Sequence, residues 1–218
     1  MAGVSAAPRL IETRVPDRPE GAVLVLHGGA SRQGSPPVSP TQLSVLRMIP
    51  IAGRIARAGR GRLAVFRLLN SVRGWDTERT PLADVAWALD QVRDRLGELP
   101  TSLVGHSLGG RAALLAGGAA PVRSVVALNP WVYPSDVADL SGRRVLIVHG
   151  TEDRIAEPGR AAGLARRLAR QTDVRFLEVP GGKHAMLRHG AVFERAAASF
   201  VTETLLGDPA EQTVDPGR

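Results

Sequence analysis

The chain has 218 residues, 44% of them hydrophobic and 22% charged, which is long enough to bury a sizeable core within one domain. It contains no cysteine, which excludes disulfides, thiolate catalysis and thiolate zinc sites. The formal net charge is +7, but the basic residues are spread along the chain and few aromatic residues are available to stack on bases. We therefore expect no nucleic-acid partner and relate the charge to solubility and non-specific binding.

Membrane spans and export signals are not expected either. No apolar stretch approaches the roughly eighteen residues that a membrane span needs. The first residues, Met1–Glu20, lack the apolar core of a secretory signal. We expect a cytoplasmic protein with one domain over residues 1–206 and a disordered tail over residues 207–218.

Short runs of Val, Leu and Ile alternate with longer helical patterns, which predicts an α/β fold with a mostly parallel sheet. The first run, Arg9–Val15, is expected to add an antiparallel edge strand. The later runs are nearly continuous in apolar residues, which is typical of strands covered by helices on both faces. The expected core strands are Ala22–Leu26, Leu63–Leu68, Ser102–Val104, Ser124–Leu128, Arg144–Val148 and Val174–Val179.

The segments between these strands carry helical spacing. Leu43–Ala58 is expected to be helical, with a kink or break at Pro50 because proline cannot donate its backbone N–H. Ser31–Pro40, rich in Ser, Pro and Gly, is expected to be a mobile loop. The other expected helices are Pro81–Leu96, Leu108–Gly117, Gly159–Arg170 and Ala191–Leu206.

The strongest chemical signal is Gly105-His106-Ser107-Leu108-Gly109, which follows a predicted strand and opens a predicted helix. A sharp strand-to-helix turn strains its central residue, and the flanking glycines avoid collisions of a Cβ with neighbouring backbone. This pattern is the G-x-S-x-G nucleophile elbow. The chain thereby resembles serine hydrolases of the α/β-hydrolase fold. The resemblance implies a mostly parallel central sheet with helices on both faces and Ser107 as the nucleophile.

The resemblance also implies the chain order nucleophile, acid, histidine. It places the catalytic histidine in the loop after the last strand, where His184 lies, with His189 as the alternative. His106 is expected to point away from the serine. His27 and His149 end strands within His-Gly pairs, so we expect them to make structural hydrogen bonds.

The acid is expected after the penultimate strand, where Asp153 closes a short loop behind His149-Gly150. Asp153 would accept a hydrogen bond from the histidine and stabilise the imidazolium formed during attack. It could instead be a turn or cap residue ahead of the next helix. Glu152 is the nearest substitute and Asp136 a remote one.

The oxyanion hole is expected to combine the backbone N–H groups of Leu108 and Gly29. In relatives with His-Gly at the end of this early strand, the residue after the pair donates its amide, which corresponds to Gly29. Ala30 is the alternative, because the register is open by one residue. The two glycines could also form a plain turn.

The chain leaves no room for a cap domain, because Asn129–Arg143 alone joins two neighbouring strands. We expect an open site walled by loops, with Trp131 and Tyr133 either in the wall or packed in the core. Arg73-Gly74-Trp75-Asp76 is expected to be a structural loop near the site. No nucleotide, metal or other cofactor is expected, because neither a phosphate loop nor metal-ligand spacing occurs.

The expected activity is hydrolysis of a small-molecule carboxylic ester or thioester through an acyl-enzyme. A peptidase or amidase of the same fold, or a non-catalytic binding protein, is the alternative, since one fold supports many functions. The sequence does not distinguish between oligomeric states.

Overall fold

The computed structural model describes residues 7–30 and 36–207. Residues 31–35 of the expected mobile loop and residues 208–218 of the expected disordered tail lie outside these described residues. All the elements below belong to the described part.

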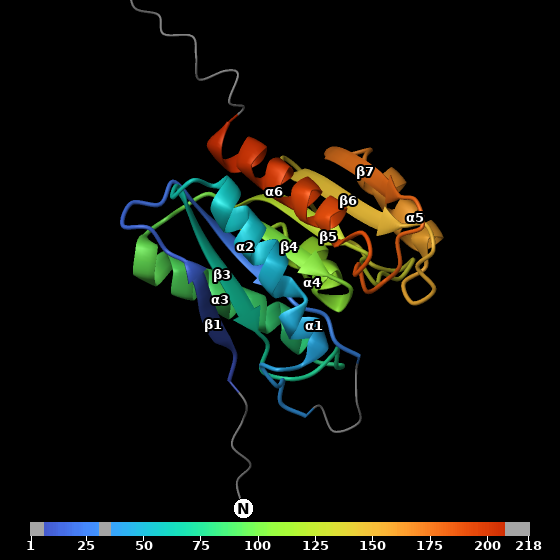
Figure 1. The fold of residues 1–218 in the computed structure, drawn as a ribbon, viewed down its shortest axis with the longest axis horizontal. Coiled ribbons are helices and arrows are strands. Elements are labelled where there is room, and N and C mark those ends of the chain that lie inside the picture. Colours follow the sequence, from blue (N-terminus) through green and yellow to red (C-terminus); the bar gives the residue numbers. More distant parts are fainter. Residues whose placement is uncertain (1–6, 31–35, 208–218) are drawn as a thin grey trace, which may run out of the picture.

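A seven-stranded sheet forms the centre of the molecule, in the order β1-β3-β2-β4-β5-β6-β7 (Figure 1). The edge strand β1 is antiparallel to β3, and all the other neighbours are parallel. The predicted antiparallel edge and parallel core are therefore confirmed. The strands are β1 (Arg9–Arg14), β2 (Gly21–Leu26), β3 (Leu63–Leu69), β4 (Thr101–His106), β5 (Val122–Leu128), β6 (Arg144–Gly150) and β7 (Asp173–Val179).

The strand order reverses direction at β2, because β3 lies on one side of it and β4 on the other. The loops that leave β2 and β4 therefore diverge at the carboxyl edge of the sheet. Such a divergence opens a crevice in which α/β proteins bind their ligands. This crevice is where the candidate residues after β2 and β4 meet.

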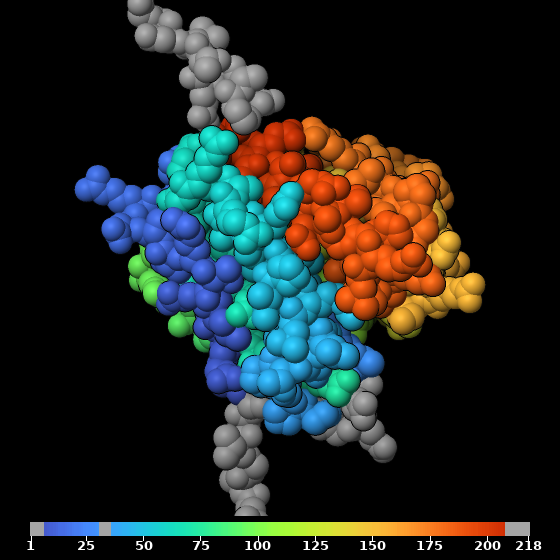
Figure 2. Space-filling model, in the orientation of Figure 1, coloured from blue at the N-terminus to red at the C-terminus, as the bar shows by residue number. Residues whose placement is uncertain are grey.

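Helices cover both faces of the sheet (Figure 1). α2 and α6 lie side by side across one face, and Figure 2 shows their side chains forming a continuous surface there. α3, α4 and α5 cover the opposite face. The helices are α1 (Leu43–Leu46), α2 (Met48–Ala58), α3 (Thr80–Leu96), α4 (Leu108–Ala116), α5 (Pro158–Leu168) and α6 (Gly190–Leu206).

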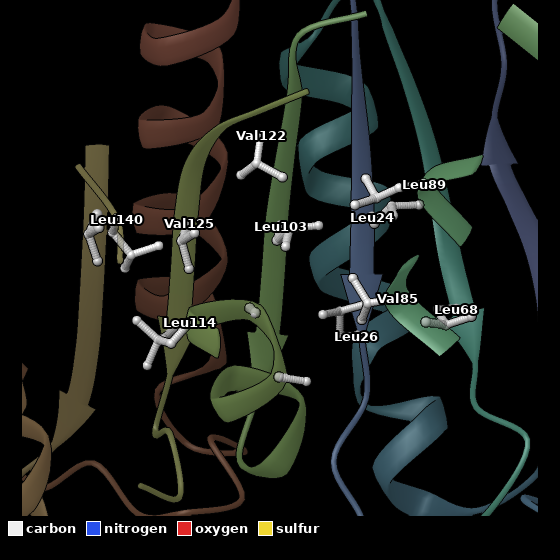
Figure 3. Packing of buried hydrophobic residues seen from close by; sticks show 14 of the residues in the cluster. Leu24, Leu26, Leu68, Val85, Leu89, Leu103, Leu114, Val122, Val125 and Leu140 are labelled. Atoms are coloured by element: carbon white, nitrogen blue, oxygen red, sulfur yellow. The ribbon is translucent and has the colours of Figure 1, made fainter. Parts of the chain in front are cut away.

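The two faces of the sheet bury separate apolar layers, because side chains alternate along a strand. On β2, Leu24 and Leu26 point into the layer shared with α3 and α4, where Val85 lies beside Leu26 and Leu114 lies by Val125 (Figure 3). Val23, on the other face, packs in the layer shared with α2 and α6. Burial on both faces explains why these strands are apolar throughout.

The helix expected over Leu43–Ala58 is divided, but not at Pro50. The break falls at Arg47, which separates α1 from α2. Pro50 lies in the first turn of α2, where its missing N–H costs nothing because first-turn amides have no partner within the helix. The expected kink at Pro50 is wrong for this reason.

The connection from β5 to β6 contains no helix or strand. The absence of a cap between these two strands is therefore confirmed. In the described part of the chain, no helix combines the length and the apolar character required to cross a bilayer.

Candidate active site

Ser107 occupies the turn between β4 and α4, with φ 56° and ψ −119°. A positive φ is costly for a residue with a Cβ, by about 1–3 kcal/mol, and persists only where the surroundings enforce it. Here the Ser107 amide donates to the Leu128 carbonyl at 3.0 Å, and the Ser107 carbonyl accepts from the Trp131 amide at 3.1 Å. These two bonds tie the strained turn to the end of β5.

The glycines around Ser107 allow backbone segments to approach closely. A Cβ on Gly105 would lie 2.1 Å from the Gly109 carbonyl oxygen, and a Cβ on Gly109 would lie 2.4 Å from that of Leu26. Both distances are far below a van der Waals contact. The glycines of the motif therefore bring α4 against the ends of β2 and β4, as the sequence pattern predicted.

Replacing Gly109 with alanine tests this packing. We expect Gly109→Ala to lower the free energy of unfolding by about 3 kcal/mol or more, because rigid backbone atoms must move to admit the methyl group. Gly163→Ala is the matched control, since Gly163 also lies in a helix and its added Cβ would meet only the end of Arg166 at 3.9 Å. Gly163→Ala should raise the free energy of unfolding by about 1 kcal/mol, because alanine favours a helix more than glycine does. Urea unfolding of both variants checks the opposite signs, and equal effects would contradict the explanation.

Three side chains from separate loops meet above the elbow. The Ser107 hydroxyl lies 3.0 Å from His184 Nε2, and His184 Nδ1 lies 2.8 Å from Asp153 Oδ2. With Nδ1 donating to the carboxylate, Nε2 is free to accept the hydroxyl proton. The structure thus brings together the nucleophile, base and acid candidates, which are 31 and 77 residues apart along the chain.

Asp153 is buried, and its carboxylate accepts hydrogen bonds from Ile155, Ala156 and His184. Its Oδ1 accepts from the amides of Ile155 and Ala156 at 2.8 and 2.9 Å. Its Oδ2 accepts from His184 and lies 3.4 Å from His149 Nε2. Burial by itself would raise the pKa of Asp153, but the hydrogen bonds from both histidines and both amides outweigh it, so the pKa lies well below its usual value. The carboxylate is therefore ionised and fixed in orientation.

Asn129 links the histidine loop to the acid-bearing strand, a role that the sequence did not predict. Its side chain is fully buried, and its Nδ2 donates to the carbonyls of Lys183 and His184 at 3.2 Å each. Its Oδ1 accepts from the Gly150 amide at 2.8 Å. Asn129 also has φ 42°, which asparagine tolerates better than most residues. An asparagine directly after a core strand was the available signal.

His106 also contacts the histidine loop. Its Nε2 donates to the His184 carbonyl at 2.8 Å, and the two rings lie 4.9 Å apart. Burial, followed by the nearby charge of His184, lowers the pKa of His106 to about 3, so its ring is neutral. Among the described residues it makes no hydrogen bond with Ser107, but it lines the same cavity, so the expectation that it points away describes its position incompletely.

The other two strand-end histidines differ from one another. His27 Nδ1 donates to the Gly28 carbonyl at 2.6 Å and its Nε2 accepts from the Asn70 amide, a purely structural role as expected. His149 donates to the Ala156 carbonyl at 3.0 Å, yet it also lies beside Asp153. Its role therefore extends beyond the expected structural bond.

The alternative acid and base candidates lie elsewhere. Asp136 forms a two-pronged ion pair with Arg111 at 2.6 and 2.9 Å. Glu152 is exposed, and His189 stands at the start of α6. The hydrogen bonds to Ser107 and to Asp153 are instead made by His184.

The oxyanion candidates all border one cavity of about 510 Å³ that contains the Ser107 hydroxyl. Leu108 is the first residue of α4, so its amide has no acceptor within the helix and lies at the positive end of the helix dipole. Gly29 and Ala30 both line the cavity, so the geometry leaves the choice between them open. Position 28 requires a glycine, because a Cβ added there would lie 2.9 Å from the Cβ of Ser107.

Aromatic side chains wall the cavity. Trp75, Trp131 and Tyr133 line it, and the Arg111 guanidinium lies between the rings of Trp75 and Tyr133, 4.1 and 4.6 Å from their centroids. The loop containing Trp75 therefore reaches the site, as expected.

A larger cavity of about 600 Å³ near Pro100 lies at the opposite edge of the sheet and is lined by neither serine nor histidine.

No family model matches the sequence, and no curated protein matches it significantly. Several solved structures share its fold. XC6422 from Xanthomonas campestris, an α/β serine hydrolase without a lid, aligns at 20% identity over 93% of this chain and 90% of that protein, with TM-score 0.69. Est1E from Butyrivibrio proteoclasticus aligns at 15% identity over 91% and 94%, with TM-score 0.68.

Esterase PE8 aligns over 93% of this chain and 100% of its own, at 20% identity and TM-score 0.64. These structural relatives are esterases or serine hydrolases. The chain therefore has the α/β-hydrolase fold, as the elbow motif predicted, with no cap between β5 and β6, as the short connection predicted.

Proposed function

We propose that the protein is a serine hydrolase that cleaves carboxylic esters or thioesters through an acyl-enzyme intermediate. The observation that carries the proposal is the continuous hydrogen-bonded chain from the Ser107 hydroxyl through His184 to Asp153, at the wall of an open cavity. A buried ionised carboxylate, an oriented imidazole and a strained serine are the parts that acyl transfer requires.

In the first half-reaction Ser107 Oγ attacks the acyl carbon while His184 Nε2 accepts the hydroxyl proton. The carbonyl oxygen of the substrate becomes an oxyanion, for which the amides of Leu108 and Gly29 are the proposed donors. The tetrahedral intermediate collapses, the bond to the leaving group breaks, and His184 returns the proton to the departing alcohol or thiol. Asp153 stays ionised and stabilises the transient imidazolium.

In the second half-reaction water replaces the leaving group. His184 takes a proton from this water, its oxygen attacks the acyl carbon, and the serine ester breaks to release the acid. Ser107 recovers its proton from His184. Because no cap lies between β5 and β6, the acyl-enzyme is accessible to water, which favours hydrolysis.

The structural relatives support an ester rather than an amide as substrate. Esterase PE8 and an arylesterase are among them, and Est1E has been seen with ferulic acid bound. At 14–20% identity these names apply to those proteins. They make aryl esters the first substrates to assay.

A fluorophosphonate probe tests the proposal directly, because it phosphonylates only a serine that an adjacent base activates. We expect peptide mass spectrometry to find the probe on Ser107, together with hydrolysis of p-nitrophenyl acetate. A folded sample that is neither labelled nor active would favour a non-catalytic protein. Faster cleavage of p-nitroanilides than of the matching esters would favour an amidase.

Asn129 provides a further prediction. Asn129→Ala removes one buried donor group and one acceptor, so the carbonyl of Lys183 and the amide of Gly150 lose a partner, which costs about 1–3 kcal/mol of stability. We also expect kcat for p-nitrophenyl acetate to fall about tenfold or more with little change in KM, since His184 would lose its fixed position.

Asn129→Asp is the comparison variant. It keeps the acceptor for Gly150 but replaces the donor toward the His184 carbonyl with a carboxylate oxygen. We expect it to lose kcat as well, whereas a role in folding alone would leave kcat per labelled active site unchanged. Active-site titration with the probe separates the two results.

A further inference from the structure

The cavity beside Ser107 is lined by arginine side chains and, among the described residues, by no carboxylate. These arginines are Arg47 and Arg111. The charge of Arg111 is balanced by Asp136, with which it pairs at 2.6 Å. Asp153 lies behind His184 and is bonded to it. Of the two arginines on the cavity lining, only Arg47 has no carboxylate partner among the described residues.

Arg47 lacks a partner in the part of the chain that the structure describes. Its side chain is half-buried, its Nε is buried without a hydrogen-bond acceptor, and none of the ion pairs among the described residues includes it. Burial also lowers its pKa from the usual value. A guanidinium has five N–H donors and no acceptor, so desolvation of the buried Nε is unfavourable until a ligand supplies an acceptor for it.

Arg47 lies close to the reacting groups. It separates α1 from α2, and its charge, after burial and the charge of His184, helps to lower the pKa of the buried His106. His106 in turn is bonded to the backbone of His184. A group bound by Arg47 would therefore share the cavity with the ester that Ser107 attacks.

A second arginine adds to the positive potential near Gly29. The Arg73 Nε is also buried without an acceptor in the described structure, and its Cγ lies 3.9 Å from where a Cβ on Gly29 would be. Residues 31–35 read Ser-Arg-Gln-Gly-Ser and contain no carboxylate that could neutralise either arginine.

We propose that Arg47 binds an anionic oxygen group, a carboxylate in the simplest case, on the substrate itself, so that the preferred substrates are esters bearing a negative charge. This inference rests on the proposed hydrolase function and specifies its substrate class. A planar guanidinium accepts a carboxylate through two parallel hydrogen bonds, which also orients the ester toward Ser107.

Two pairs of esters test the inference and differ in which half of the substrate bears the charge. In the first pair, 4-acetoxybenzoate carries the charge on its leaving group and its methyl ester is the neutral control. In the second pair, monophenyl adipate carries the charge on its acyl group and its methyl ester is the neutral control. Phenol release gives kcat/KM for each, and dividing by the rate of alkaline hydrolysis removes the difference in intrinsic reactivity.

In at least one pair the wild-type protein should prefer the anionic ester by about ten- to hundredfold, the effect of a charged hydrogen-bonded contact. The preference should shrink as ionic strength rises. Arg47→Gln should abolish it and Arg47→Lys should keep part of it. Arg57→Gln, which removes an exposed arginine from the last turn of α2, is the matched control and should keep all of it.

Wild-type inhibition gives a second measurement if Arg47→Gln does not fold. Benzoate should inhibit neutral-ester hydrolysis competitively, and neutral benzamide should not. Hydrolysis of the neutral esters without an anionic preference, or an equal loss in Arg57→Gln, would overturn the inference and leave the hydrolase function intact. Absence of both hydrolysis and Ser107 labelling would overturn the two together.

Discussion

Ser107→Ala should lower kcat for p-nitrophenyl acetate by about 10⁶-fold, because it removes the only atom proposed to form the acyl-enzyme. The substitution removes one oxygen at a site held open by backbone contacts, so the fold should be retained. Fluorophosphonate labelling should disappear with the activity. Stopped assays with purified protein, corrected for uncatalysed hydrolysis, measure the loss.

Ser199→Ala is the matched control, since Ser199 is exposed on α6, away from the cavity. We expect it to keep wild-type kcat and full labelling. Ester hydrolysis by Ser107→Ala within about tenfold of wild type would rule out the acyl-enzyme route. A loss of the same size in both variants would point to inactivation of the preparation.

Asp153→Asn should lower kcat by about 10⁴-fold through the tautomer of His184. The amides of Ile155 and Ala156 hold the Oδ1 position as an acceptor, so the new amide nitrogen must occupy the Oδ2 position. There it would donate to His184 Nδ1 and move the ring proton to Nε2. An Nε2 that carries a proton cannot accept one from Ser107.

Glu152→Gln is the comparison variant, because Glu152 is the neighbouring carboxylate and is exposed. It should remain within about 0.5 kcal/mol of wild-type stability and keep full activity. A large loss of activity in Glu152→Gln but not in Asp153→Asn would show that Glu152, and not Asp153, is the acid.

The difference in stability between wild type and Asp153→Asn should depend on pH in a defined direction. The folded-state pKa of Asp153 is lowered, so the carboxylate stabilises the protein above its unfolded pKa of about 3.9, and this stability is lost as pH falls toward the folded-state pKa. The difference in free energy of unfolding between wild type and Asp153→Asn should therefore be largest at neutral pH and should shrink in acid. Urea unfolding between neutral and acidic pH measures it.

Most of the framework was predictable from the sequence because its signals are local. Apolar runs predicted the strands, and the Gly-x-Ser-x-Gly motif predicted the strained turn now seen at Ser107. The resemblance to α/β-hydrolases implied Asp153 and His184 although they lie far from Ser107 in the chain, and residues that each follow a parallel strand lie at one edge of the sheet. Their direct hydrogen bonds agree with that expectation.

The tertiary structure decided what depends on contacts between distant segments. Asn129 contacts a carbonyl 55 residues away, and its position directly after a core strand does not indicate which carbonyl it contacts. The break at Arg47 rather than Pro50, and the absence of a counter-charge for Arg47 among the described residues, also emerge only when helices and loops are packed. Sequence periodicity reports which face of an element is buried, whereas pairing of a buried polar group depends on which elements are its neighbours.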